Sequence, residues 1–149
     1  MMSEIDRRLS DFCRARGIPG IILRRRSNLA WAADGADVHC DTATSLGVAA
    51  LLWSPARKAC LTDTIESPRL RAEEPFERQD WAVEALDWWE ADRRIADALA
   101  AGYACDFPDD PLHDARATLT ADQQARARGL GRDTAEVVER IPARTASPA

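Results

Sequence analysis

The stretch VAALLWSPARKACLT, residues 48–62, decides the fold that the sequence predicts. Residues 48–53 and 58–62 are two runs compatible with β-strands, and the tetrapeptide SPAR at residues 54–57 separates them. Serine and proline favour turns, and a loop of this length commonly connects paired strands. The stretch therefore predicts an antiparallel β-hairpin.

Helices and further strands are expected on both sides of this hairpin. Residues 3–16 place apolar side chains at helical spacing, behind a capping pattern that starts at Ser3 and before a stop at Gly17. The other expected elements are strands at 19–23, 76–78 and 103–107 and helices at 28–33, 68–74 and 87–101. Interleaved helices and strands predict a single three-layer α/β domain, with a mixed β-sheet flanked by helices.

A long helix is expected near the end of the chain. Residues 120–141 open with a T-x-x-Q capping box. Beyond it, one helical face carries Leu130, Thr134, Val138 and Ile141. We therefore expect a domain at residues 1–116, a C-terminal helix at 117–141 and a disordered tail at 142–149.

Composition excludes several classes of protein. The 149 residues are 46% hydrophobic and 30% charged, which suits a single buried core. A net charge of -5 argues against a nucleic-acid binder, and no apolar run approaches the roughly 20 residues that span a membrane. The acidic N-terminus does not resemble a secretory signal, and the four cysteines contain no C-x-x-C pair. We expect a cytoplasmic protein with reduced thiols, of which Cys60 and Cys105 pack in the core.

Five short motifs follow one another along the chain. They are GIPGIIL at residues 17–23, SNLAW at 27–31, LLWSP at 51–55, ACLTD at 59–63 and IESPRLRAEE at 65–74. Their order resembles the N-terminal domain of the creatinase, prolidase and aminopeptidase P family, the pita-bread metallopeptidases. The segment LGRDTAEVVE at residues 130–139 is similar to the first helix of that family's catalytic domain.

The resemblance implies the family's accessory domain, with a ribonuclease H-like topology and a part in oligomer contacts. In the family, a binuclear metal site of two Asp, one His and two Glu lies in a further segment that these residues do not include. We therefore expect no catalytic, cofactor-binding or metal-binding residues, and no enzyme activity.

Some residues match the family's motif positions. They are Asn28, Trp31, Asp63, Glu66 and Arg69. Local roles explain the polar ones: Asn28 can turn the chain, Asp63 and Glu66 can cap the helix that follows, and Arg69 can pair with one of these carboxylates.

Other residues that could carry chemistry have simpler interpretations. His39 and His113 lack the spacing of metal ligands, and we expect both in surface loops. The aspartates between residues 106 and 114 could bind Mg²⁺, as in ribonuclease H-like nucleases, but prolines interrupt them. We favour turn-forming aspartates there, and a solvated strand end for the arginines at residues 24–26.

Two surfaces are candidates for binding another protein. Trp88 and Trp89 point about 100° apart on a helix, so both are buried only under a wide cover. We favour core packing for this pair and keep a partner interface as the alternative. The second surface is the apolar side of the last helix, with Leu130, Val137, Val138 and Ile141.

The expected function is that of a stand-alone, non-catalytic module that acts by association. We expect a homodimer in which the last helix takes part, because it would otherwise expose its apolar face. A full-length metallopeptidase relative is another expected partner, whereas nucleic acid and membranes are not. The alternatives are a degenerate, truncated Xaa-Pro peptidase relative without function, and a small hydrolase with an unrecognised site.

Overall fold

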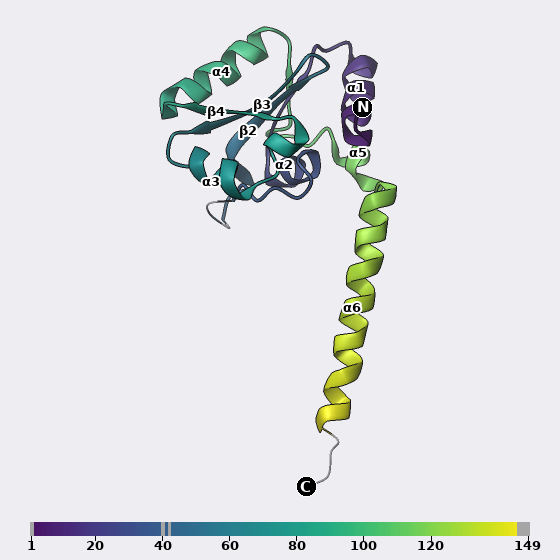
Figure 1. Cartoon of the computed structure of the whole chain (residues 1–149). Helices are drawn as coiled ribbons and strands as arrows, with labels where there is room; N and C mark the ends of the chain where they lie inside the picture. Colours follow the sequence, from purple (N-terminus) through teal and green to yellow (C-terminus); the bar gives the residue numbers. More distant parts are fainter. Residues whose placement is uncertain (1, 40, 42, 146–149) are drawn as a thin grey trace. The chain divides into compact units, whose positions relative to one another are not determined.

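The computed structural model describes residues 2–39, 41 and 43–145, with side chains up to residue 141. In chain order the elements are α1 (Glu4–Arg16), β1 (Ile21–Arg25), α2 (Arg26–Ala32), β2 (Leu46–Ser54), β3 (Arg57–Asp63), α3 (Ser67–Glu73), the 3-10 helix η1 (Glu77–Gln79), β4 (Ala82–Leu86), α4 (Trp88–Ala100), β5 (Ala104–Cys105), α5 (His113–Ala117) and α6 (Ala121–Thr145) (Figure 1). They belong to two units, residues 1–116 and residues 117–149.

Residues 1–116 contain a five-stranded mixed sheet in the order β4-β3-β2-β1-β5. The predicted hairpin is confirmed, since β2 and β3 pair antiparallel with Leu51 opposite Cys60. β1 pairs antiparallel with β2, with Ile21 opposite Trp53. Both outer strands run parallel to their neighbours, β4 to β3 and β5 to β1. The predicted α/β class with a mixed sheet is therefore confirmed.

Side chains alternate between the two faces of the sheet, and different helices cover each face (Figure 1). One face holds Ile21, Leu23, Ala49, Leu51, Trp53 and Cys60, packed with Leu9 and Phe12 of α1, Leu29 and Trp31 of α2 and Leu70 of α3. The other face holds Ile22, Ala50, Leu52, Ala59 and Leu61, packed with Ile95 and Ala98 of α4. A period of two with apolar side chains on both faces produces three layers.

Helix α1 begins and ends at its predicted signals and is fastened to the sheet. The Ser3 hydroxyl accepts a hydrogen bond from the Asp6 N–H at 3.0 Å, and Gly17 ends the helix with a φ of 64°. The Asp6 carboxylate accepts a hydrogen bond from the Trp53 indole at 2.9 Å and lies 3.3 Å from Lys58 Nζ. Burial alone would raise the pKa of Asp6, but hydrogen bonds from Trp53 and Ser3 and the charge of Lys58 hold it below its ordinary value.

Replacing Asp6 with asparagine is expected to lower the free energy of unfolding at neutral pH by about 1 kcal/mol, because the variant loses the ion pair with Lys58. A carboxylate with a lower pKa in the folded state stabilises the protein above its ordinary pKa of 3.8, and this contribution is lost as the pH falls through the folded-state pKa. Urea unfolding over this pH range should therefore show the difference between variant and parent shrinking in acid. Asp11→Asn, which changes an exposed carboxylate of the same helix, is the control, and a constant difference for Asp6→Asn would contradict the assignment.

The outer strands differ from the sequence prediction. The prediction of a strand at residues 76–78 is wrong, because residues 77 and 78 belong to η1. The strand β4 follows at Ala82–Leu86. Every residue of β4 is at least partly exposed, so this edge strand lacks the apolar pattern that marks the inner strands. β5 ends at Cys105, earlier than predicted, and the next residue, Asp106, uses its buried carboxylate to bind backbone N–H groups of β1. The helices predicted in residues 1–116 lie within two residues of their expected bounds.

Helix α6 begins at the predicted capping box, four residues after the expected bound of 117, and ends later than predicted. Thr120 N–H donates to Gln123 Oε1 at 2.9 Å, and Gln123 N–H donates to Thr120 Oγ1 at 3.2 Å, which confirms the capping box. The helix continues past Ile141 to Thr145, so the prediction of a disordered tail is wrong for residues 142–145. The proline at position 142 removes one N–H donor, and the backbone remains helical around it. Residues 146–149 of the predicted tail lie outside the described residues.

Candidate functional site

Asn28 lies at the centre of a polar network that joins the end of β1 to the loop after β5. Its amide donates hydrogen bonds to Asp106 Oδ2 at 2.8 Å and to Asp110 Oδ1 at 3.1 Å. Asp106 is fully buried and also accepts hydrogen bonds from the backbone N–H groups of Arg24 and Arg25, at 2.7 and 3.1 Å. A buried carboxylate is tolerated because these donors surround it. The network therefore fixes the junction between β1 and α2.

Asp110 forms the outer part of this network. Its carboxylate also accepts a hydrogen bond from the Leu112 N–H at 3.3 Å and pairs with Arg116. Burial alone would raise the pKa of Asp110, but hydrogen bonds from Asn28 and Arg116 hold it below its ordinary value. The expected turn-forming role thus fits Asp110. It is wrong for Asp106, whose carboxylate accepts hydrogen bonds from the backbone of β1, a strand distant in the sequence.

The other family-motif positions also support the fold around α3. Asp63 Oδ1 accepts a hydrogen bond from the Glu66 N–H at 2.8 Å, as a cap of the following turn would. Arg69 lies 3.0 Å from the carboxylate of Glu66 and 3.6 Å from that of Glu74, which confirms the predicted ion pair. Trp31 is buried in the core, with 8% of its surface exposed. These residues hold the domain together and do not converge on a reactive centre.

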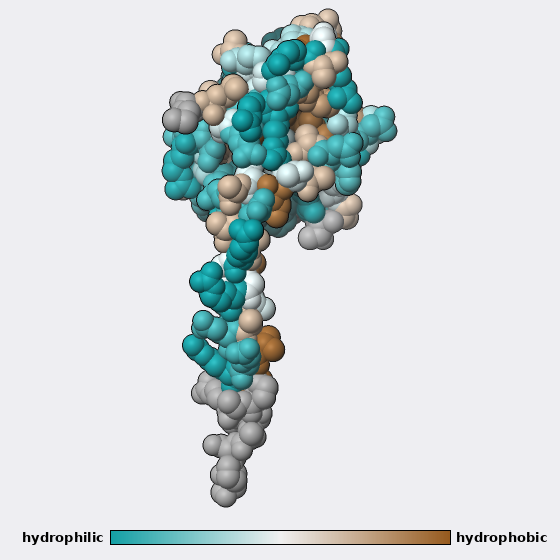
Figure 2. All heavy atoms as spheres, turned by 90° about the vertical axis from the view of Figure 1, so that its right-hand side faces the viewer, coloured by the Kyte–Doolittle hydropathy of each residue, from teal (hydrophilic) through white to brown (hydrophobic). Residues whose placement is uncertain are grey.

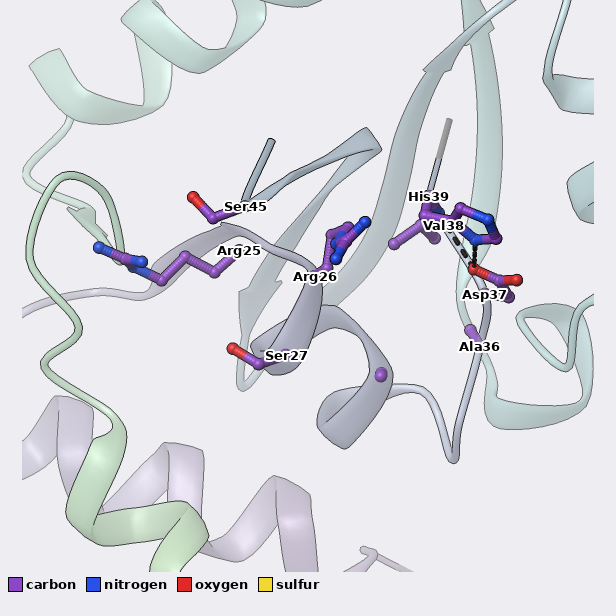
Figure 3. A pocket seen from close by; sticks show the side chains of 9 residues that line it. Arg25, Arg26, Ser27, Ala36, Asp37, Val38, His39 and Ser45 are labelled. Atoms are coloured by element: carbon purple, nitrogen blue, oxygen red, sulfur yellow. Dashed lines mark hydrogen bonds and ion pairs between the residues drawn. The ribbon is translucent and has the colours of Figure 1, made fainter. Parts of the chain in front are cut away.

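A hollow of about 540 Å³ lies between α2 and the segment after it, beside Arg25 at the end of β1 and Arg26 at the start of α2 (Figure 3). Arg25 extends away from His39 towards the loop after β5, where it donates hydrogen bonds to backbone oxygens (Figure 3). Arg26 donates to the backbone oxygen of Asp41 at 3.0 Å. His39 is bonded to Asp37, and this hydrogen bond holds the pKa of Asp37 below its ordinary value. Both arginine side chains thus donate hydrogen bonds to backbone oxygens of the protein. His39 lies on the surface as expected.

The cysteines and the second histidine also have structural roles. Burial raises the pKa of the Cys13 thiol to about 11 and that of Cys60 to about 12, so both are protonated and unreactive at neutral pH. Cys60 is a core residue as predicted, Cys105 is partly buried, and Cys40 lies outside the described residues. His113 is exposed as expected but begins α5 instead of lying in a loop. Among the described residues, no group of three or more His, Cys, Asp or Glu side chains is placed to hold a metal ion.

Trp88 and Trp89, at the start of α4, are largely exposed, so the favoured core packing is wrong. Trp88 exposes 76% of its surface and Trp89 58%, and their rings meet edge to face with centroids 5.5 Å apart. Helix α4 is buried through Ile95 and Ala98, whereas Leu99 near its end exposes 45% of its surface. The sheet covers a narrow strip of this helix and leaves its first turn uncovered.

A groove of about 190 Å³ lies beside Trp88 on the α4 side of the sheet. Its apolar lining includes Ala50 and Leu61 from the two central strands, and its charged lining is Arg24, Asp63 and Asp92. Trp88 therefore stands at the edge of a concave surface, and large aromatic side chains in such places commonly anchor protein partners.

Helix α6 carries the second candidate surface, which we call the α6 stripe. It consists of Leu130, Val137, Val138 and Ile141, which expose 70%, 56%, 60% and 58% of their surfaces. Hydrophobic side chains gather on one side of this helix (Figure 2). Ion pairs four residues apart, Asp122 with Arg126 and Glu136 with Arg140, stabilise the helix. An apolar stripe of this kind is typical of a helix that packs on another element.

Sequence reasoning identified the exposed face of α6, held the exposed Trp88–Trp89 pair only as an alternative, and missed the buried role of Asp106. The only local signal was the position of an aspartate directly after a short apolar strand. No helix among the described residues combines the length and the apolar character needed to cross a membrane. Comparison of the chain with protein-family models, with curated proteins and with solved structures gives no match.

Proposed function

We propose that the chain is a non-catalytic module of the creatinase N-terminal kind, with a ribonuclease H-like topology, which works by association. A second copy of the chain is the first partner, and a full-length metallopeptidase relative is the other. The order of the five motifs supports this proposal, since the motifs at residues 17–23 and 51–63 fall on β1 and on the β2–β3 hairpin. The protonated, unpaired thiols of Cys13 and Cys60 fit a reducing compartment such as the cytoplasm.

The exposed α6 stripe is the observation that carries the proposal. Burying one aliphatic side chain of this size stabilises a protein by about 1.5–3 kcal/mol relative to leaving it in water. A lone helix is marginal in water, and Gly129 and Gly131 each lower its intrinsic stability by about 1 kcal/mol relative to alanine. A partner that covers the stripe therefore stabilises both the helix and the complex. The exposed Trp88–Trp89 pair offers a second contact surface of the same apolar kind.

Light scattering at tens of micromolar chain is expected to show a dimer, and Val138→Asp is expected to weaken it at least tenfold, because the interface would bury an unpaired carboxylate. Ala135→Asp is the matched control, since it introduces the same charge on the same helix at a position outside the stripe. An intact protein that remains monomeric would remove the second copy as the partner. A Val138→Asp variant that dimerises as well as the intact protein would remove the helix as the contact.

A further inference from the structure

The apolar and small side chains of α6 are spaced alternately three and four residues apart. The series is Ala127, Leu130, Thr134, Val137 and Ile141. This spacing is the heptad repeat of a coiled-coil seam, in which every member of the series faces the partner helix. Between Leu130 and Ile141, the positions that flank such a seam hold Asp133 and Arg140 on one side and Gly131 and Val138 on the other.

We propose that the α6 seam pairs with the same seam of a second copy, antiparallel, in the register that sets Asp133 opposite Arg140 of the second copy. This inference rests on the proposed function and adds the partner's orientation and register. In this register Leu130 packs on Ile141 of the second copy, and Thr134 packs on Val137. Two-fold symmetry makes each contact twice, so two Asp133–Arg140 ion pairs flank the seam.

Charge complementarity distinguishes this register from the two neighbouring ones. Shifting the second helix by one heptad in one direction sets Asp133 against Asp133 of the second copy, and shifting it in the other sets Arg140 against Arg140. Both shifts replace attraction with repulsion. In the described part of the chain Asp133 has no ion-pair partner, and Arg140 uses its Nη2 atom to bind Glu136 at 3.1 Å. Charges beside a coiled-coil seam commonly choose the partner and its orientation in this way.

The polar and small positions of α6 fit the same arrangement. The Thr134 hydroxyl donates to the Leu130 backbone oxygen at 2.7 Å, so its burial in the seam leaves no hydroxyl without a partner. A Cβ atom added at Gly131 would meet nothing within 4 Å, so the packing of this chain does not require glycine there. In the proposed register Gly131 lies opposite Val138 of the second copy and leaves room for its branched side chain.

A parallel pair is less favourable for the same residues. It would set Ala127 on Ala127 and Thr134 on Thr134, so two of its five layers would hold only small or polar side chains. It would also place Asp133 against Val138 of the second copy, a carboxylate against an apolar side chain. The antiparallel register instead matches each large seam residue with a smaller or branched one and each charge with its opposite.

A charge exchange tests the register, with dissociation constants measured by sedimentation equilibrium. Asp133→Arg and Arg140→Asp are each expected to weaken the dimer about tenfold, which corresponds to about 1.4 kcal/mol, because each sets two like-charged pairs against each other. The double variant Asp133→Arg/Arg140→Asp is expected to return to within about twofold of the intact protein, because both pairs are restored with reversed polarity. An equimolar mixture of the two single variants should form heterodimers as tightly as the double variant forms homodimers. In the heterodimer each flanking pair again joins an arginine of one chain to an aspartate of the other.

Glu139→Arg and Arg132→Asp are the matched controls, because they make the same charge changes on the side of the helix away from the seam. Circular dichroism of each variant checks that α6 remains helical. Single variants that weaken the dimer no more than these controls, or a double variant that is not restored, would overturn the register. If Val138→Asp weakens the dimer but the charge exchange does not restore it, only the proposed register is wrong. If the intact protein is monomeric, the proposed self-association itself is wrong.

Discussion

Replacing Asp106 with alanine is expected to lower the free energy of unfolding by about 3–5 kcal/mol. The buried carboxylate accepts hydrogen bonds from the backbone N–H groups of Arg24 and Arg25 and from the Asn28 amide. Alanine removes the acceptor and leaves three donors without a partner, and each unsatisfied buried group costs about 1–3 kcal/mol. Because these donors belong to β1 and α2, the loss of their hydrogen bonds destabilises the centre of the domain.

The measurement is urea unfolding followed by tryptophan fluorescence and by circular dichroism. Asp109→Ala is the matched control, since Asp109 is an exposed aspartate in the same loop. Asp106→Asn is expected to be intermediate, because its Oδ1 accepts while its Nδ2 faces groups that also donate. A loss below about 1 kcal/mol for Asp106→Ala would contradict the role assigned to this carboxylate.

Replacing Gly20 with alanine is expected to lower the free energy of unfolding by about 2–3 kcal/mol, the cost of forcing extra atoms into a packed interior. A Cβ atom at this position would lie 2.4 Å from the Trp53 backbone oxygen and 2.4 Å from Tyr103 Cε1. The Tyr103 ring can rotate, but the Trp53 oxygen belongs to β2, whose pairing with β1 fixes its position. The substitution must therefore distort the central strands.

Gly129→Ala is the control for this substitution. A Cβ atom at Gly129 would meet nothing within 4 Å, and alanine is the better helix former, so helix α6 should gain about 1 kcal/mol. The same urea experiment, with circular dichroism as the probe, measures both variants. Equal stabilities for Gly20→Ala and the parent protein would show that β1 and β2 can separate at no cost.

The central hairpin was predictable because both of its strands and its turn are adjacent in the sequence. Residues 48–62 carry the apolar runs and the turn formers in one window, and their pairing needs no other part of the chain. The edge strand β4 was missed because it pairs parallel with β3 across the intervening helix α3. Its sequence, AVEAL, also lacks the apolar alternation of a strand that is buried on one face.

Candidate site residues were predictable where their roles are local. The pairing of Arg69 with Glu66 spans three residues, and the sequence was enough to suggest it. The Asp106 carboxylate binds backbone groups 81 and 82 residues earlier, a contact that no local pattern encodes. For Trp88 and Trp89, their angular separation on a helix correctly indicated that a narrow contact could not bury both. The general tendency of tryptophan to be buried then favoured the wrong outcome.

The two edges of the sheet determine how neighbouring molecules can meet. β5 is only two residues long, and the chain continues from it into a buried aspartate and then Phe107 and Pro108, so it offers almost no free ladder of backbone groups. On β4, Arg71 Nη2 donates to the Val83 backbone oxygen at 2.8 Å, which holds a charged side chain against this edge strand. Short strands, prolines and charged side chains at edges are the devices that prevent one sheet from growing into the next. Molecules of this protein at high concentration should therefore resist β-type aggregation.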